Sequence, residues 1–340
     1  MLKAARTTWR AVSRPREWGT ECFIAPEGLR ETVLTGNRLE QIRPPVIGVD
    51  FGGTGIKAGI VEGGRVLRSF DEPTPTTGRA EDVLDAIARA VLALTPKPES
   101  VGIAIPGEVD SEGRCWGLPN VPGFRGVNLG VRLSEKLGCP VAVENDATTA
   151  ALGEYLCGHG TRFPSFLMVT LGTGVGGGLV LGGQLYPGAN GFAGEIGHIN
   201  VDRSEGAPPC GCGRRGCLET YTGTAALKRM FKTFGGYDVA GIKEIADNAR
   251  AGGRAGLDTF QAMGEWLGRG LSAIQNTLDL NALIFTGGIS NAFDLIEPSL
   301  RTALRENCVA EPLAEVPLVV SELGAQAGVI GAAHLPQLGA

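Results

Sequence analysis

A dense group of metal-binding residue types occupies the stretch EIGHINVDRSEGAPPCGCGRRGCLE, which runs from Glu195 to Glu219. Its spacing is H-x11-C-x-C-x4-C, and three soft thiolates with one imidazole suit a tetrahedral zinc ion. A disulfide or free thiols are the alternatives, but three clustered cysteines would leave one unpaired. Four protein ligands would leave no open position, so the predicted zinc is structural. The predicted ligands are His198, Cys210, Cys212 and Cys217.

Three glycine-rich turns, each of which follows an apolar strand, have the composition of phosphate-binding loops. Because glycine has no Cβ, the backbone N–H groups of such a turn can converge on phosphate oxygens. Asp50, at the end of the first strand, is a predicted ligand for a hydrated magnesium ion. The turns predict a cradle for a nucleoside triphosphate; ordinary hairpins are the alternative, and no Walker P-loop is present. They are Gly52-Gly53-Thr54-Gly55, Gly172-Thr173-Gly174 and Thr286-Gly287-Gly288.

A possible general base follows the buried strand PVAVEND, which carries Asn145 and Asp146 at its end. A carboxylate at this place can accept a proton from a substrate hydroxyl, and such help is typically worth ~10²–10⁴ in rate. A helix begins at about Ala147 and runs through Tyr155, so Asp146 can also be read as a helix cap. Spacing alone leaves both readings open.

The elements that must position these residues alternate between strand and helix patterns. The order β-β-β-α-β-α-β predicts an α/β sheet, and ligands in such sheets bind at the carboxyl ends of the strands. Apolar strands are expected at Val46–Asp50, Ile56–Glu62, Val66–Phe70, VGIAIPG and PVAVEND, and helices at Ala80–Leu94 and Leu129–Leu137.

The second half of the chain repeats this plan. SFLMVTLGTGVGGGLVLGGQLY reads as strand, glycine turn and strand, with Gly182-Gly183 at a hairpin tip, and resembles VIGVDFGGTGIKAGIVEGG in the first half. NALIFTGGIS is a further buried strand that ends in Thr-Gly-Gly. The repeat predicts two related halves with a cleft between them, although glycine turns are common enough for coincidence to be the alternative.

Composition excludes several classes of protein. The chain has 340 residues, a formal net charge of −5 and 43% hydrophobic residues, which is typical of a globular protein without a basic surface for nucleic acid or membrane. Residues 163–194 carry no charge, but ten glycines break this stretch, which argues against a membrane helix. Residues 1–44 read as a disordered extension or a misassigned start, with a faint likeness to a transit peptide. A cytoplasmic location is expected.

Five segments together resemble the signature of the ROK family of bacterial sugar kinases and repressors. They are IGVDFGGTGIKAG, VENDATTAALGE, LGTGVGGG, GEIGHI and CGCGRRGCLE, and they lie in the family's order between Val46 and about Ala333. The resemblance implies the actin-like, hexokinase-type ATPase fold (ribonuclease H-like), with two α/β domains flanking a cleft. The smaller domain would be 46–145, completed by a C-terminal helix 325–337. The larger would be 146–324, with its zinc loop at 198–217.

The resemblance also implies roles for single residues. ATP phosphates would lie against the first two turns, with adenosine near Gly287 and Gly288. Asp146 would be the base that activates the 6-hydroxyl of a hexose, with glucose as the expected substrate. The family's histidine uses one ring nitrogen for zinc and the other for the sugar. Sugar hydroxyls would be bound by Asn145, Glu195, His198 and Glu219, with Gly107 and Asn120 at the other rim.

One departure from the family bears on the phosphate donor. Many ROK kinases have lysine directly after Gly-Gly-Thr, whereas here Gly55 follows and the lysine is Lys57. This loop looks more like that of polyphosphate-using glucokinases, which commonly lack the zinc cluster, so ATP is the expected donor and polyphosphate the alternative. Other sugars remain open, namely N-acetylmannosamine, mannose, N-acetylglucosamine and fructose. So do a sugar-responsive repressor and a binding protein without turnover. Members of this family are often dimers or tetramers, and the resemblance implies the same for this chain.

Overall fold

Two five-stranded sheets share one strand order in the computed structural model, which describes residues 46–118, 121 and 123–338. The first sheet runs β3-β2-β1-β4-β7 and the second runs β10-β9-β8-β11-β12. In each sheet the first three strands pair antiparallel and the next two pairings are parallel. The predicted repetition of one plan is therefore confirmed at the level of topology. Expectations for residues 1–44 and for Asn120 lie outside the described residues.

The first sheet follows the predicted strands closely. Its strands are β1 (Val46–Phe51), β2 (Gly55–Glu62), β3 (Arg65–Pro73), β4 (Val101–Ile105) and β7 (Val141–Asn145). Helices α1 (Ala80–Leu94) and α2 (Leu129–Leu137) pack against it and have the predicted bounds. Both present apolar residues at helical spacing to the core, and α2 begins at an Asn128 cap whose side chain accepts the Val131 N–H.

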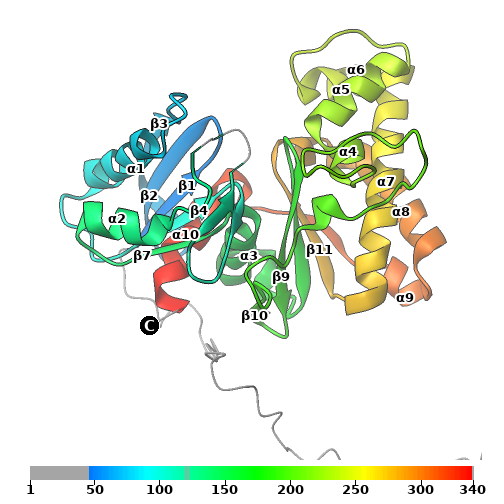
Figure 1. The fold of residues 1–340 in the computed structure, drawn as a ribbon. Coiled ribbons are helices and arrows are strands. Elements are labelled where there is room, and N and C mark those ends of the chain that lie inside the picture. Colours follow the sequence, from blue (N-terminus) through cyan, green and yellow to red (C-terminus); the bar gives the residue numbers. More distant parts are fainter. Residues whose placement is uncertain (1–45, 119–120, 122, 339–340) are drawn as a thin grey trace, which may run out of the picture. The chain divides into compact units, whose positions relative to one another are not determined.

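The second sheet carries the larger helical layer (Figure 1). Its strands are β8 (Phe166–Leu171), β9 (Val175–Leu181), β10 (Gln184–Leu185), β11 (Ala282–Thr286) and β12 (Leu318–Val320). The long helix α7 (Arg254–Leu278) packs against α8 (Phe293–Asn307), α6 (Ile242–Arg250) and α5 (Thr224–Thr233). Their buried faces form one apolar core with the sheet, which includes Phe231, Phe260 and Phe285.

Two helices connect the sheets. Helix α3 (Asp146–Cys157) contacts β8 and β9 of the second sheet, and α10 (Ala327–Leu338) contacts β1 and β4 of the first. The two helices also pack on each other. A 3₁₀ turn, Gly324–Gln326, precedes α10, so the regular helix begins two residues later than the predicted 325.

The expected domain boundary between residues 145 and 146 coincides with the junction of β7 and α3, and it stays a prediction. Among the residues that the structure describes, no helix combines the length and apolarity that a membrane span requires.

Candidate active site and metal centre

The junction of β7 and α3 settles which residue caps the helix. Asn145 is the N-cap: its Oδ1 accepts the N–H groups of Ala147 at 2.9 Å and Thr148 at 3.1 Å. Its Nδ2 donates to the Gly107 carbonyl at 3.1 Å, which ties the start of α3 to the end of β4. Asp146 is thus not the cap, and its carboxylate accepts the local Ala147 N–H at 2.8 Å. The sequence could not separate these roles because both residue types cap helices.

Asp146 has the electrostatics of a base that works near neutral pH. Burial raises the pKa of its carboxyl to about 7, and the nearby charges of Asp50 and Glu195 add to the rise. Burial also raises the pKa of Asp50, while Lys57, its cross-strand partner, opposes that shift. The charge of Asp50 acts on Asp146, so the two carboxyls lie near each other, and carboxylate oxygens are ligands that a hydrated magnesium ion takes. Asp50 therefore fits the predicted magnesium site.

For the predicted sugar phosphorylation, we expect kcat/KM to fall about tenfold per pH unit below about pH 7, because Asp146 must be ionised to accept a proton. A profile from about pH 5.5 to about pH 8.5 at saturating phosphate donor checks this. Burial raises the pKa of Glu144 to about 7 as well. Glu144→Gln is therefore the matched control. If that variant loses the inflection, the titrating group is not Asp146.

Glu195 and His198 are held against the second sheet by a close backbone contact. Gly194 has φ +94°, and a Cβ there would lie 2.1 Å from the Gly177 carbonyl oxygen of β9. Only glycine allows this approach, and it places the following Glu195 within reach of His198, with Oε2 3.8 Å from Nε2. The other ring nitrogen of His198, Nδ1, lies 3.6 Å from Oε1 of Glu219. These three side chains, all predicted to bind sugar, therefore form one group.

The four predicted metal ligands converge. One ligand atom from each residue lies within 4.8 Å of all the others. Cys212 Sγ and Cys217 Sγ are 3.7 Å apart, and Cys210 Sγ is 3.6 Å from His198 Nδ1. Tetrahedral zinc with Zn–S of ~2.3 Å and Zn–N of ~2.0 Å places its ligand atoms roughly 3.5–3.8 Å apart. The donor set and these two distances therefore fit zinc, and Nδ1 of His198 lies toward Cys210 while Nε2 lies toward Glu195.

The first glycine turn is closed by a residue that the sequence did not reveal. The Gly52 N–H donates to the Gly55 carbonyl at 2.8 Å. Thr74, buried just after β3, donates its hydroxyl to the Gly52 carbonyl at 2.6 Å and its N–H to the Thr54 carbonyl at 3.2 Å. Thr74 lies about twenty residues from the turn and has no local motif, so only the β2–β3 pairing brings it there.

Thr74→Val should raise the KM for the phosphate donor roughly fivefold, because the turn loses one of the bonds that hold its carbonyl. The KM for the sugar should change little. Steady-state kinetics with each substrate varied in turn checks the split. Thr233→Val, which removes a hydroxyl from a helix surface, is the control. Equal changes in both KM values would show a general loss of folding instead.

The second glycine turn contacts the group formed by Glu195, His198 and Glu219, which is called the sugar wall from here on. The Gly172 N–H donates to the Gly174 carbonyl at 3.1 Å, and the Gly172 carbonyl accepts both the N–H and the hydroxyl of Thr224. A Cβ at Gly174 would lie 2.6 Å from Oε2 of Glu219, so that carboxylate lies against the turn. Gly287 packs on Leu171, the residue before this turn, which brings the third turn beside the second. The predicted phosphate and sugar residues are therefore neighbours here.

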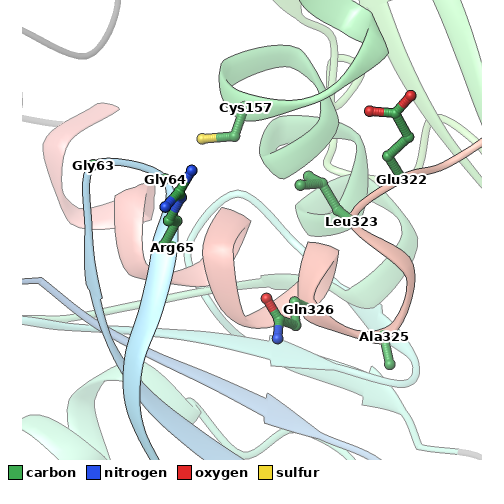
Figure 2. Close-up of a pocket in the computed structure, with 8 residues that line it drawn as sticks. All are labelled: Gly63, Gly64, Arg65, Cys157, Glu322, Leu323, Ala325 and Gln326. Atoms are coloured by element: carbon green, nitrogen blue, oxygen red, sulfur yellow. The ribbon is translucent and has the colours of Figure 1, made fainter.

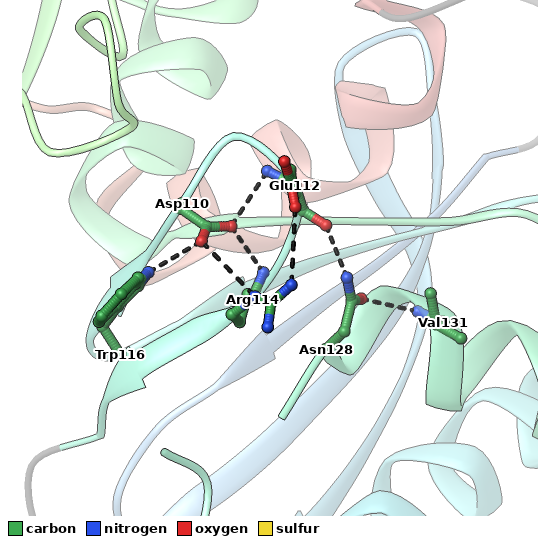
Figure 3. A network of polar contacts seen from close by, with 6 residues as sticks. All are labelled: Asp110, Glu112, Arg114, Trp116, Asn128 and Val131. Carbon is green, nitrogen blue, oxygen red and sulfur yellow. Dashed lines mark hydrogen bonds and ion pairs between the residues drawn. The ribbon is translucent and has the colours of Figure 1, made fainter. Parts of the chain in front are cut away.

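A hairpin that the sequence did not predict forms one rim of the candidate sugar site. It consists of β5 (Glu108–Val109) and β6 (Cys115–Gly117), directly after Gly107. Asp110 holds it together by accepting hydrogen bonds from the N–H groups of Glu112 and Arg114 and from Trp116 Nε1 (Figure 3). Burial is the main cause of the raised pKa of Glu195. The charge of His198 lowers this pKa, and the charge of Glu108 raises it further. The hairpin therefore lies near the predicted sugar wall.

A separate cavity of about 660 Å³ opens at the β2–β3 turn (Figure 2). It contains none of the predicted site residues. Its lining residues are Gly63, Gly64, Arg65, Cys157, Glu322, Leu323, Ala325 and Gln326.

Comparison with known proteins finds relatives that cover most of the chain. The ROK family model matches residues 46–338. A glucokinase from Streptomyces coelicolor is 36% identical over 315 residues, covering 85% of this chain and 96% of that protein. A glucokinase from Thermotoga maritima is 33% identical over 307 residues, with the same coverage of each chain.

Among solved structures, a ROK family glucokinase from Streptomyces griseus in complex with glucose and AMPPNP superposes with a TM-score of 0.75 at 36% identity. The match covers 86% of this chain and 99% of that one. The expected actin-like, hexokinase-type fold is thereby confirmed.

Proposed function

The chain belongs to the ROK family, and on this premise we propose that it is a sugar kinase that transfers the γ-phosphoryl group of ATP to the 6-hydroxyl of glucose. The observation that carries the proposal is the position of Asp146: a carboxyl with a pKa of about 7 beside Asp50 and Glu195. Glucose and ATP as substrates are supported by the glucokinase relatives and by the glucose and AMPPNP in the related structure.

The residues divide the reaction between them. Glu195, His198 and Glu219 bind the sugar hydroxyls and fix the ring, and Asn145 holds the start of α3 so that Asp146 faces the 6-hydroxyl. Asp146 takes the hydroxyl proton as the sugar oxygen attacks the γ-phosphorus. The new O–P bond forms as the bond to the β-phosphate oxygen breaks, and ADP leaves in line. The backbone N–H groups of the two glycine turns stabilise the phosphate charge.

Two metal ions are proposed with different tasks. Magnesium, held through Asp50, would neutralise phosphate charge. Zinc, held by His198, Cys210, Cys212 and Cys217, would fix the loop without entering the reaction, since its four ligands are all protein groups. The side chains of His198 and Glu219 are then ordered before the sugar arrives, which lowers the entropy cost of binding. Cysteines in the reduced form and the use of ATP both favour a cytoplasmic location for the protein.

The experiment is an assay of ADP release with ATP and magnesium over glucose, mannose, N-acetylmannosamine, N-acetylglucosamine and fructose. A parallel series replaces ATP with polyphosphate and follows glucose 6-phosphate, because the Gly55–Lys57 loop leaves that donor open. We expect the highest kcat/KM with glucose and ATP. Preference for another sugar or donor would correct the substrate. No turnover by metal-loaded protein on any pair of sugar and donor would refute the kinase and favour a binding protein.

Light scattering on the same sample tests the expected dimer or tetramer.

A further inference from the structure

Hydrogen bonds outside the metal-ligand group join the two segments of the sugar wall, among them a backbone bond from the Leu218 N–H to the Ile199 carbonyl at 2.9 Å and a side-chain bond. Tyr221, in the short helix α4 (Glu219–Thr222), donates its hydroxyl to the carboxylate of Asp202. Asp202 lies shortly after His198 in the chain, and Tyr221 lies two residues after Glu219. The bond therefore connects the segment that presents His198 to the helix that presents Glu219.

The ring of Tyr221 packs against helix α7. It stacks on Trp266 of α7, with ring centroids 4.0 Å apart and an interplanar angle of 24°. The Arg269 guanidinium lies 4.5 Å from the centroid of the Trp266 ring. Because α7 is packed into the core of the second sheet, the Tyr221 ring has a rigid support.

The aspartate is fixed as well. Its Oδ1 accepts the Ser204 N–H at 2.8 Å, and its own N–H donates to the Gly216 carbonyl at 3.3 Å, where the metal loop returns. The hydrogen bond from Tyr221 lowers the pKa of Asp202, and burial followed by this bond raises the pKa of Tyr221. At neutral pH the pair is therefore a phenol and a carboxylate, which makes a charge-assisted hydrogen bond.

From these contacts we infer that the Tyr221–Asp202 hydrogen bond is a positioning latch for the sugar wall, which acts beside the metal. Helix α4 has only four residues, too few to fix the direction of Glu219 by itself. The latch ties α4 to the His198 segment on one side and to α7 on the other. The side chains of the two residues contact each other, Ser204 and Trp266, and none of these belongs to a predicted phosphate turn. The inference rests on the proposed function in assigning His198 and Glu219 to the sugar.

Tyr221→Phe tests the latch because it keeps the ring on Trp266 and removes only the hydroxyl. We expect the KM for glucose to rise about tenfold, while kcat stays within about twofold and the KM for ATP does not change. Amide hydrogen exchange in residues 199–217 should become about tenfold faster. Tyr237→Phe, whose ring packs edge-on against Phe231 away from this wall, is the matched control.

Asp202→Ala and the Tyr221→Phe/Asp202→Ala double variant complete a cycle. Asp202→Ala also removes the acceptor of the Ser204 N–H, so a latch predicts that the double variant has the same glucose KM as Asp202→Ala alone, whereas additive effects would overturn it. Wild-type exchange and wild-type KM in Tyr221→Phe would also overturn it. If the wild-type protein phosphorylated no sugar, the proposed function would fail, and the hydrogen-exchange comparison would still decide the latch.

Discussion

Asp146→Asn should lose most of its turnover and keep its affinity for glucose. Asparagine has nearly the same size but cannot accept the proton of the attacking hydroxyl, so kcat should fall by roughly 10²–10⁴. The sugar contacts assigned to Glu195, His198 and Glu219 remain, so the glucose Kd measured by calorimetry should change less than about threefold. A kcat close to that of the wild type would remove Asp146 from the role of base.

The same variant should be more stable than the wild type at alkaline pH. The folded-state pKa of Asp146 is raised to about 7 from 3.8, so between these values the folded protein binds more protons than the unfolded chain. Its contribution to stability therefore falls as the pH rises through this window and is most unfavourable above pH 7. Replacing the carboxyl by a neutral amide removes that penalty, and the gain should vanish near pH 4.

Thermal unfolding of ligand-free protein at pH 8 and at pH 4 measures the effect. Asp238→Asn, which breaks an exposed ion pair with Lys232, is the control and should show little change at either pH. A lower unfolding temperature for Asp146→Asn at pH 8 would mean that the carboxylate is stabilised in the fold, contrary to its raised pKa.

Cys212→Ala should release the metal and weaken sugar binding. Three remaining ligands would hold zinc less tightly, and the loop from His198 to Cys217 would lose its central restraint. We expect loss of bound zinc on gel filtration and a rise of at least about tenfold in the glucose KM. The KM for ATP should change less, since Cys212 lies among the other metal ligands and not in a glycine turn.

Cys308→Ala is the matched control, because this free thiol follows α8 and lies outside the ligand group. Elemental analysis of both variants and of the wild type gives the metal content. A wild-type protein purified without metal, or a Cys212→Ala variant with wild-type zinc and KM, would contradict the metal centre.

Local patterns and long-range contacts differ in how well the sequence reveals them. Helices α1 and α2 have the predicted bounds because apolar residues recur at helical spacing and capping chemistry is local. The metal ligands were predictable because their spacing is itself the signal. By contrast, the β5–β6 hairpin and the Thr74 and Tyr221 contacts depend on which segments meet in space. No local pattern specifies these contacts, and single threonines and tyrosines are too common to mark them.

The choice between Asn145 and Asp146 shows the limit most clearly. Both residues are good caps, and both lie where a strand ends and a helix begins. Only the backbone geometry, with Asn145 accepting the first helical N–H groups, frees the carboxylate next to it. The sequence predicted the position of the two candidate residues, and the backbone geometry assigns the capping role to Asn145.

The contact between Glu219 and Gly174 has a consequence for engineering. Broadening the range of phosphate donors by enlarging the second glycine turn would place the first added carbon 2.6 Å from a carboxylate oxygen of Glu219. Because the same side chain lies 3.6 Å from His198 Nδ1, a displaced Glu219 would disturb the sugar wall as well. On the roles proposed for these residues, a change of donor range at this turn would also change sugar selectivity.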